Sequence, residues 1–224
     1  MMMNTRQPWR LSAVALLFAP AMFAATVSMT LTSAGGNISN GVYVNPYTAS
    51  INGVSTTVIC DDYVDDSYVG ESWTADVHTL SDLTNTRWGS QPGLYNEAAW
   101  LSIQLLGTSD AATRAAISFA IWGVFVGQAI TDFGGPSSAA QTWLNNAASH
   151  AQDHFDNVLI YTPNTSYPIT CDGHSCANTP PQEFLVVRTP EAPAAAFLGL
   201  NLAALGALVL FLRRRAFHAP ELPV

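Results

Sequence analysis

An uninterrupted apolar run near the end of the chain is the feature that most constrains the fold. It covers residues 194–212 and contains no charged side chain. These 19 residues come close to the roughly 20 that a helix needs to cross a bilayer. The cluster Arg213, Arg214 and Arg215 follows directly, and such a cluster is retained in the cytoplasm. The pattern predicts one transmembrane helix, with residues 216–224 as a cytoplasmic end. A buried core helix is the alternative, although core helices are rarely apolar on every face.

A second, shorter apolar run lies at the start of the chain. Two arginines precede residues 11–23, and the small residues Ala24 and Ala25 follow. This order is typical of a secretory signal peptide, here residues 1–25, with cleavage after one of the two alanines. An uncleaved anchor is the alternative. Export leaves residues 26–188 as one extracytoplasmic domain, which is long enough to bury its own core.

The charge of the chain argues against a nucleic-acid partner. The sequence has no lysine, and its 8 basic residues stand against 16 acidic ones, for a net charge of −8. Only three arginines fall within residues 26–188. Such an acidic surface repels a phosphate backbone, so we expect no binding to nucleic acid.

The pattern in the first third of the domain predicts antiparallel strands. Residues 27–32 alternate apolar and polar side chains, as a half-buried strand does. Asn52-Gly53 separates two β-forming segments, residues 47–51 and 54–60, which indicates a hairpin. Shorter strands are predicted at residues 73–77, 158–161 and 184–188.

The middle of the domain has helical periodicity. The first predicted helix covers residues 94–106. The second is capped by Ser109-Asp110 and runs through Val126. The third starts at Pro136-Ser137, and its apolar positions continue to Ala151. We therefore predict an α+β fold. It consists of an antiparallel β-sheet domain with an inserted three-helix portion, plus an N-terminal signal helix and a C-terminal single transmembrane helix.

The end of the chain resembles the PEP-CTERM sorting tail, also labelled an ice-binding protein C-terminal domain. The tail, residues 189–215, begins with a short motif, continues with the apolar run and ends in the arginine cluster. Its motif residues are Thr189, Pro190, Glu191 and Ala192, where the family usually has Pro-Glu-Pro. The resemblance implies that a membrane-embedded exosortase cuts near the motif. The protein would then be released or transferred to the cell surface or the exopolysaccharide matrix.

The domain itself resembles the thioester domains of bacterial surface adhesins. The shared motifs are Cys60-Asp61-Asp62, a helix over residues 95–106, and Ala120-Ile121-Trp122. In that family a cysteine and a glutamine condense into a thioester, which captures a nucleophile on a target. The glutamine lies two residues before Ala-Ile-Trp, where this chain has Ser118. Because serine has no carbonyl to acylate, the resemblance implies the fold more than the chemistry.

The three cysteines suggest one disulfide and one free thiol. Export places the domain in an oxidising compartment, and four residues separate Cys171 from Cys176, so we predict that these two form a disulfide. The remaining thiol, Cys60, is expected to be a buried small side chain. A reactive thiol is the alternative, but the adjacent Asp61 and Asp62 would raise its pKa.

Two clusters of potential metal ligands do not have the pattern of a metal site. The run Asp61, Asp62, Asp65 and Asp66 lacks the spacing of a calcium loop, so we predict a solvated acidic turn. His150 and His154 lie four residues apart on the third predicted helix, without a third zinc ligand in the sequence pattern. We therefore expect polar helix surface there, and neither a metal site nor another cofactor.

The predicted function is that of a non-catalytic exported surface or extracellular-matrix protein. The sequence has no nucleophile elbow, phosphate loop or dinucleotide fingerprint. Expected partners are the membrane, an exosortase-type enzyme and an exopolysaccharide. The domain would first be held outside the inner membrane and later reach the cell surface or the matrix. Two alternatives are a thioester-type covalent adhesin that uses Cys60 and a glycan-acting enzyme.

Replacing Arg213, Arg214 and Arg215 with serine should lower the fraction of protein that sediments with membranes. The guanidinium groups would no longer hold the end of the helix in the cytoplasm. The measurement is membrane fractionation of producing cells, with Arg188→Ser as the matched control. A parent chain that is freely soluble in the cytoplasm would contradict the prediction.

Overall fold

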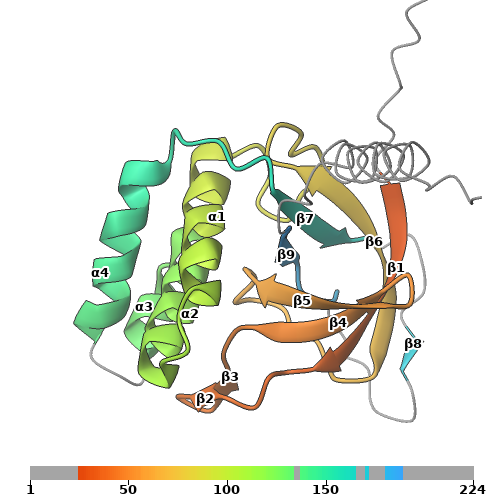
Figure 1. Ribbon diagram of the computed structural model, residues 1–224, viewed down its shortest axis with the longest axis horizontal. Helices are drawn as coiled ribbons and strands as arrows, with labels where there is room; N and C mark the ends of the chain where they lie inside the picture. Colours follow the sequence, from red (N-terminus) through yellow and green to blue (C-terminus); the bar gives the residue numbers. More distant parts are fainter. Residues whose placement is uncertain (1–24, 134–136, 165–169, 172–179, 189–224) are drawn as a thin grey trace, which may run out of the picture.

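The computed structural model describes residues 25–133, 137–164, 170–171 and 180–188. Most of the predicted signal peptide and all of the predicted sorting tail lie outside these residues. Within them, no helix combines the length and the apolar character that a membrane span requires. The domain is α+β, with strands on one side and helices on the other (Figure 1).

Six antiparallel strands close into a barrel. Neighbouring strands pair in the order β1, β4, β5, β9, β7, β6, and β6 pairs back with β1. The predicted antiparallel sheet is thus confirmed, and its closure removes the edges that an open sheet would expose. The strands are β1 (Ala25–Ser33), β4 (Tyr47–Ile51), β5 (Val54–Cys60), β6 (Glu71–Thr79), β7 (Val158–Pro163) and β9 (Phe184–Val187).

Short strands lie outside this closed circuit. β8 (Thr170–Cys171) extends the sheet beside β6, and β2 (Ile38–Ser39) pairs with β3 (Val42–Tyr43). The predicted hairpin between β4 and β5 is confirmed at both strand boundaries. Asn52 and Gly53 have φ angles of 49° and 85°, the left-handed conformations that a tight two-residue hairpin requires.

The helices are inserted between β6 and β7, as predicted. They are α1 (Pro92–Leu106), α2 (Ala111–Phe125), α3 (Gln128–Asp132) and α4 (Ser137–Ala147), followed by a 3-10 turn at Ala148–His150. Asp110 caps α2 by accepting a hydrogen bond of 2.8 Å from the Thr113 amide. The short α3 was not predicted, because five residues are too few to show helical periodicity.

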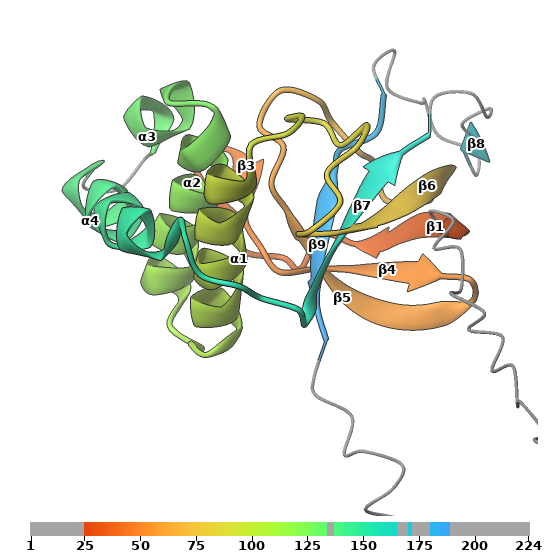
Figure 2. The same cartoon turned by 90° about the horizontal axis from the view of Figure 1, so that it is seen from above.

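Strand alternation divides the core into two parts. Val58 and Cys60 of β5 point into the barrel, whereas Ile59 between them packs in the cluster formed with the helices. β7 and β9 alternate in the same way, so both strands contribute to both clusters. Figure 2 shows α1 beside β9, where the helical layer meets the barrel.

The glycine turn after β1 should tolerate a side chain at Gly36 better than at Gly35. Gly35 and Gly36 have φ angles of 76° and 86°, and a Cβ on Gly35 would lie 2.5 Å from the Pro46 carbonyl oxygen. Gly36 has nothing within 4 Å, so Gly36→Ala should cost only the left-handed conformation, about 1 kcal/mol. Gly35→Ala should cost about 1–3 kcal/mol more because of overpacking. Urea unfolding of both variants measures the difference, and equal losses would contradict the predicted clash.

Candidate functional site

The pairing of β5 with β9 brings two acidic side chains together. Cys60 lies opposite Phe184 at the end of the described ladder, and the next pair is Asp61 opposite Glu183. The Asp61 amide donates to the Glu183 carbonyl at 3.4 Å. Alternation turns both side chains out of the barrel towards the helices, and directly opposed Cβ atoms lie about 4.5–5.5 Å apart. Both residues are fully buried.

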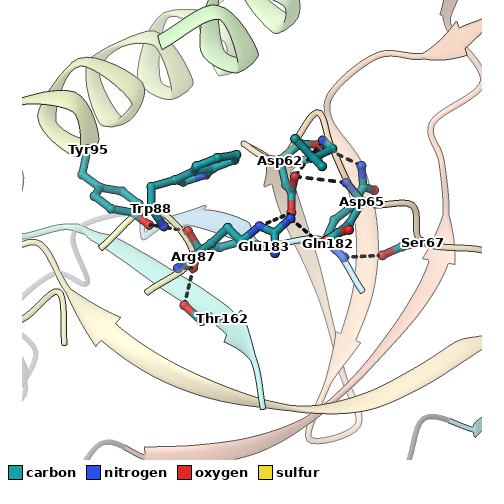
Figure 3. Close-up of polar contacts among 11 residues, drawn as sticks. Asp62, Asp65, Ser67, Arg87, Trp88, Tyr95, Thr162, Gln182 and Glu183 are labelled. Atoms are coloured by element: carbon teal, nitrogen blue, oxygen red, sulfur yellow. Dashed lines mark hydrogen bonds and ion pairs between the residues drawn. The ribbon is translucent and has the colours of Figure 1, made fainter. Parts of the chain in front are cut away.

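Glu183 is held by three donors from three different segments (Figure 3). Its carboxylate accepts hydrogen bonds from the Tyr95 hydroxyl at 2.5 Å, from the Arg87 amide at 2.9 Å and from the Thr162 hydroxyl. Burial raises the pKa of Glu183, while the hydrogen bonds from Thr162, Tyr95 and Arg87 lower it. The donors thus favour the charged form of Glu183 and tie α1, β7 and the 83–89 loop to β9.

Asp61 is the partner without donors. Among the described residues, no group donates a hydrogen bond to either of its carboxyl oxygens. Burial raises the pKa of Asp61 well above its usual range, and the negative charges of Glu183 and Asp62 raise it further. A buried carboxylate without hydrogen bonds is costly, so we infer that Asp61 is the neutral, protonated member of the pair.

Arg87 neutralises two further buried acids (Figure 3). Its Nε lies 3.3 Å from Asp62 Oδ2, and its Nη2 lies 2.6 Å from Asp65 Oδ2. Asp62 Oδ1 also accepts from the amides of Val64 and Asp65, at 2.8 and 3.2 Å. Burial raises the pKa of Asp65, the charge of Asp62 raises it further, and Arg87 lowers it.

The prediction of a solvated acidic turn is therefore wrong for Asp61, Asp62 and Asp65. Only Asp66 of that run is exposed. The physical reason is that the ladder with β9 continues beyond Cys60 and carries the acids inward, while distant hydrogen-bond donors and Arg87 stabilise the cluster.

The two positions singled out by the thioester resemblance, Cys60 and Ser118, are joined through Asn45. The Asn45 side chain donates to the Cys60 carbonyl at 3.0 Å and accepts from the Cys60 amide at 2.8 Å. The Asn45 amide donates to Ser118 Oγ at 3.1 Å, and Trp122 Nε1 donates to the Cys60 carbonyl at 2.9 Å. The Ser118 hydroxyl itself donates to the Arg114 carbonyl at 2.8 Å.

Cys60 is a free, buried thiol, as expected. Its Sγ donates to the Asp62 carbonyl at 3.1 Å. Burial raises its pKa well above the usual value, and the charge of Asp62 raises it further, so the nucleophilic thiolate is disfavoured.

Several other predicted sites lie wholly or partly outside the described residues. They are Cys176 of the predicted disulfide with Cys171, the motif Thr189 to Ala192, and Arg213 to Arg215. All of them stay predictions.

A pocket of about 550 Å³ opens to solvent next to the buried cluster. It lies between the end of β1, the β2–β3 hairpin and the 62–69 loop. Several of its walls are exposed apolar or aromatic side chains, with Tyr43 50% exposed and Tyr68 48% exposed. We call it the tyrosine pocket; its lining includes Tyr43, Tyr47, Tyr63, Tyr68, Trp122, Asp62, Asp65, Asp66, Ser67 and Gln182.

Gln182 connects the tyrosine pocket to the buried cluster. Its side-chain amide donates to the Asp62 carbonyl at 2.9 Å, and its backbone amide donates to Ser67 Oγ at 2.8 Å. The residue next to it in the chain is Glu183. The pocket wall is thereby fixed to the segment before β9 that carries Glu183, one member of the buried acid pair.

The prediction that His150 and His154 share one helix face is wrong, because α4 ends at Ala147, the 3-10 turn ends at His150, and His154 lies in the loop that follows. The His150 Nδ1 contacts Asp153 Oδ2 at 2.7 Å, and its ring stacks on Trp100 with centroids 4.4 Å apart. His154 is exposed. In the part of the chain that the structure describes, no group of three or more His, Cys, Asp or Glu side chains could hold a metal ion.

Sequence reasoning missed Glu183, Arg87, Asn45 and the role of Tyr95. One available indication was that Glu183 directly precedes a strand and shares the alternation of Leu185, which places it on a buried face. Asn45 and Arg87 offer no comparable pattern, since their partners are distant in the chain.

Neither the comparison with protein-family models nor that with curated proteins finds a match for this chain.

The geometry separates the groups that a ligand from solution cannot reach from those that it can. The carboxyls of Asp61 and Glu183 and the thiol of Cys60 are buried and could act only on a group inside the domain. The tyrosine pocket, in contrast, can admit a ligand from solution.

Asp61→Asn should stabilise the domain increasingly as the pH rises. The folded chain keeps the Asp61 proton, which the unfolded chain loses above about pH 4, so the parent loses stability as the pH rises towards the folded pKa. Asparagine removes this dependence and can also donate to Glu183. The difference in unfolding free energy should move in favour of the variant by up to about 1.4 kcal/mol per pH unit.

Urea unfolding between pH 4.5 and 7.5 measures this difference. Asp156→Asn, which removes an exposed acid, is the matched control and should change stability by little. A difference between the Asp61 variant and the parent that is constant with pH would contradict the protonated state of Asp61.

Proposed function

We propose that this protein is an exported, non-catalytic surface or extracellular-matrix protein whose folded domain binds a matrix saccharide in the tyrosine pocket. The signal peptide at residues 1–25 exports the chain, and the helix at residues 194–212 anchors it. The PEP-CTERM-like motif from Thr189 to Ala192 directs its sorting by an exosortase-type enzyme. The tyrosine pocket is the observation that carries the binding function.

The lining of the pocket suits a saccharide. A sugar ring offers apolar C–H faces and a rim of hydroxyls. Tyr43 and Tyr68 provide half-exposed rings for the faces, and aromatic rings contribute large apolar contact area. Asp66 and the Ser67–Gln182 pair lie beside them as hydrogen-bonding groups. A concave site with mainly apolar walls and a few polar groups is the usual form of a small-ligand site.

The buried position of the reactive groups favours binding over chemistry. Glycosidases of the common type place two carboxyl groups on either side of a substrate bond, and Asp61 and Glu183 have no exposed surface. A covalent adhesin needs an acyl donor beside the cysteine, and Ser118 cannot supply one. We therefore favour non-covalent saccharide binding over the two alternatives, the glycan-acting enzyme and the thioester adhesin.

The double variant Tyr43→Ala/Tyr68→Ala should weaken binding to exopolysaccharide purified from the producing cells. Each ring contributes about 1 kcal/mol, so the loss should be roughly thirtyfold in affinity. Co-sedimentation of the full chain in detergent with the polysaccharide is the measurement. Val54→Ala removes an exposed apolar side chain outside the pocket and serves as control. Equal binding by the parent and the double variant would refute the proposed site, whereas hydrolysis of the polysaccharide would support the enzyme.

A further inference from the structure

We propose that the tyrosine pocket selects saccharides that carry a protonated amine over neutral and acidic saccharides. This inference rests on the proposed function, because it specifies the ligand of the same pocket. An amino-sugar unit is the chemical class that combines a hydroxylated ring with such a charge.

Among the described residues, the charged residues that line the pocket are all acidic. They are Asp62, Asp65 and Asp66, and of these only Asp66 is exposed. Arg87, which is not among the lining residues, pairs with Asp62 and Asp65. One positive charge therefore stands against the three negative charges of Asp62, Asp65 and Asp66. Of the ion pairs in the described residues, none involves Asp66, which is exposed. The pocket therefore presents a net negative potential to an entering ligand.

Two buried acids lie behind the exposed Asp66. Asp62 is fully buried and Asp65 is 6% exposed. The Oδ2 atom of each is buried and makes an ion pair with Arg87, so neither is open to a hydrogen bond from a ligand. These two acids act on an entering ligand through their charge, and Asp66 is the acid that can contact it.

Two of the tyrosines that line the pocket already use their hydroxyls in hydrogen bonds within the domain. The Tyr47 hydroxyl donates to the Tyr43 carbonyl at 2.6 Å, and the Tyr63 hydroxyl donates to Asp132 Oδ2 at 3.1 Å. The Tyr63 ring also packs on Trp122, with centroids 5.4 Å apart. Aromatic faces attract cations through their quadrupole, so rings and carboxylates act on an ammonium group in the same direction.

Four tetrasaccharides of matched length test this selectivity by calorimetry on the full chain in neutral detergent at pH 6. They are β-1,4-linked glucosamine, its N-acetylated counterpart, the corresponding glucose oligomer and a uronate oligomer. We expect the glucosamine tetramer to bind about tenfold more tightly than the two neutral ones and the uronate to bind most weakly. Raising the salt from about 0.05 to 0.5 M should remove most of this preference, because salt screens exposed charges.

Two pairs of variants connect the preference to the pocket. Asp66→Asn should weaken glucosamine binding roughly three- to fivefold and leave neutral binding unchanged, whereas Asp156→Asn, outside the pocket, should alter neither. Tyr68→Leu should lower the preference, and Tyr68→Phe should keep it, because only the ring is needed.

The outcomes separate the two proposals. If neutral and amine-bearing tetramers bind equally and the Tyr43→Ala/Tyr68→Ala variant loses both, the selectivity is overturned and the proposed binding function stands. A preference for the uronate also overturns the selectivity. An amine preference that Asp66→Asn leaves intact overturns the proposal that the acids of the tyrosine pocket cause it. If no tetramer binds and the double variant still sediments with exopolysaccharide like the parent, the proposed site fails together with the inference.

Discussion

The structure depends on how the domain accommodates two acids that face each other across β5 and β9. Like charges directly opposite one another destabilise a sheet, and here both are also buried. The two acids are treated differently: among the described residues, Glu183 receives three hydrogen bonds and Asp61 receives none. Burial raises the pKa of Asp61, which favours its neutral form. The donors come from α1, β7 and the 83–89 loop, so satisfying one carboxylate joins the helical layer to the barrel.

The same cluster also shapes the outer surface. The Arg87 amide binds Glu183 inside the domain, and its guanidinium binds Asp62 and Asp65 at the wall of the tyrosine pocket. The Asp62 carbonyl accepts from both the Cys60 thiol and the Gln182 side chain. Because these contacts involve buried groups, movement of the pocket wall would leave polar atoms without partners. The pocket wall is thus fixed by buried polar contacts.

Features set by neighbouring residues could be predicted from the sequence. The Asn52-Gly53 hairpin and the Asp110 cap of α2 depend on a few adjacent side chains, and the structure has both. Closure of the barrel could not be predicted, because it requires β1 to pair with β6 and β5 with β9 across long stretches of chain. The error at Asp61, Asp62 and Asp65 has this same origin. Charged residues normally stay in water, and only their partners, Arg87 and the donors around Glu183, reveal why these do not.

The residues of the thioester-like motifs also show which features could be predicted from neighbouring residues and which could not. Cys60 and Ser118 could be singled out from their neighbours in the sequence, but the residue that joins them, Asn45, lies in no recognisable motif. Its carboxamide bonds to both backbone groups of Cys60 and so holds the end of β5 against α2, where Trp122 binds the same carbonyl. A cysteine fixed in this way, with its thiol protonated inside the barrel, serves the packing of the site. The charge available to a ligand is carried instead by Asp66, six residues further along the chain, where β5 has ended and the side chain meets water.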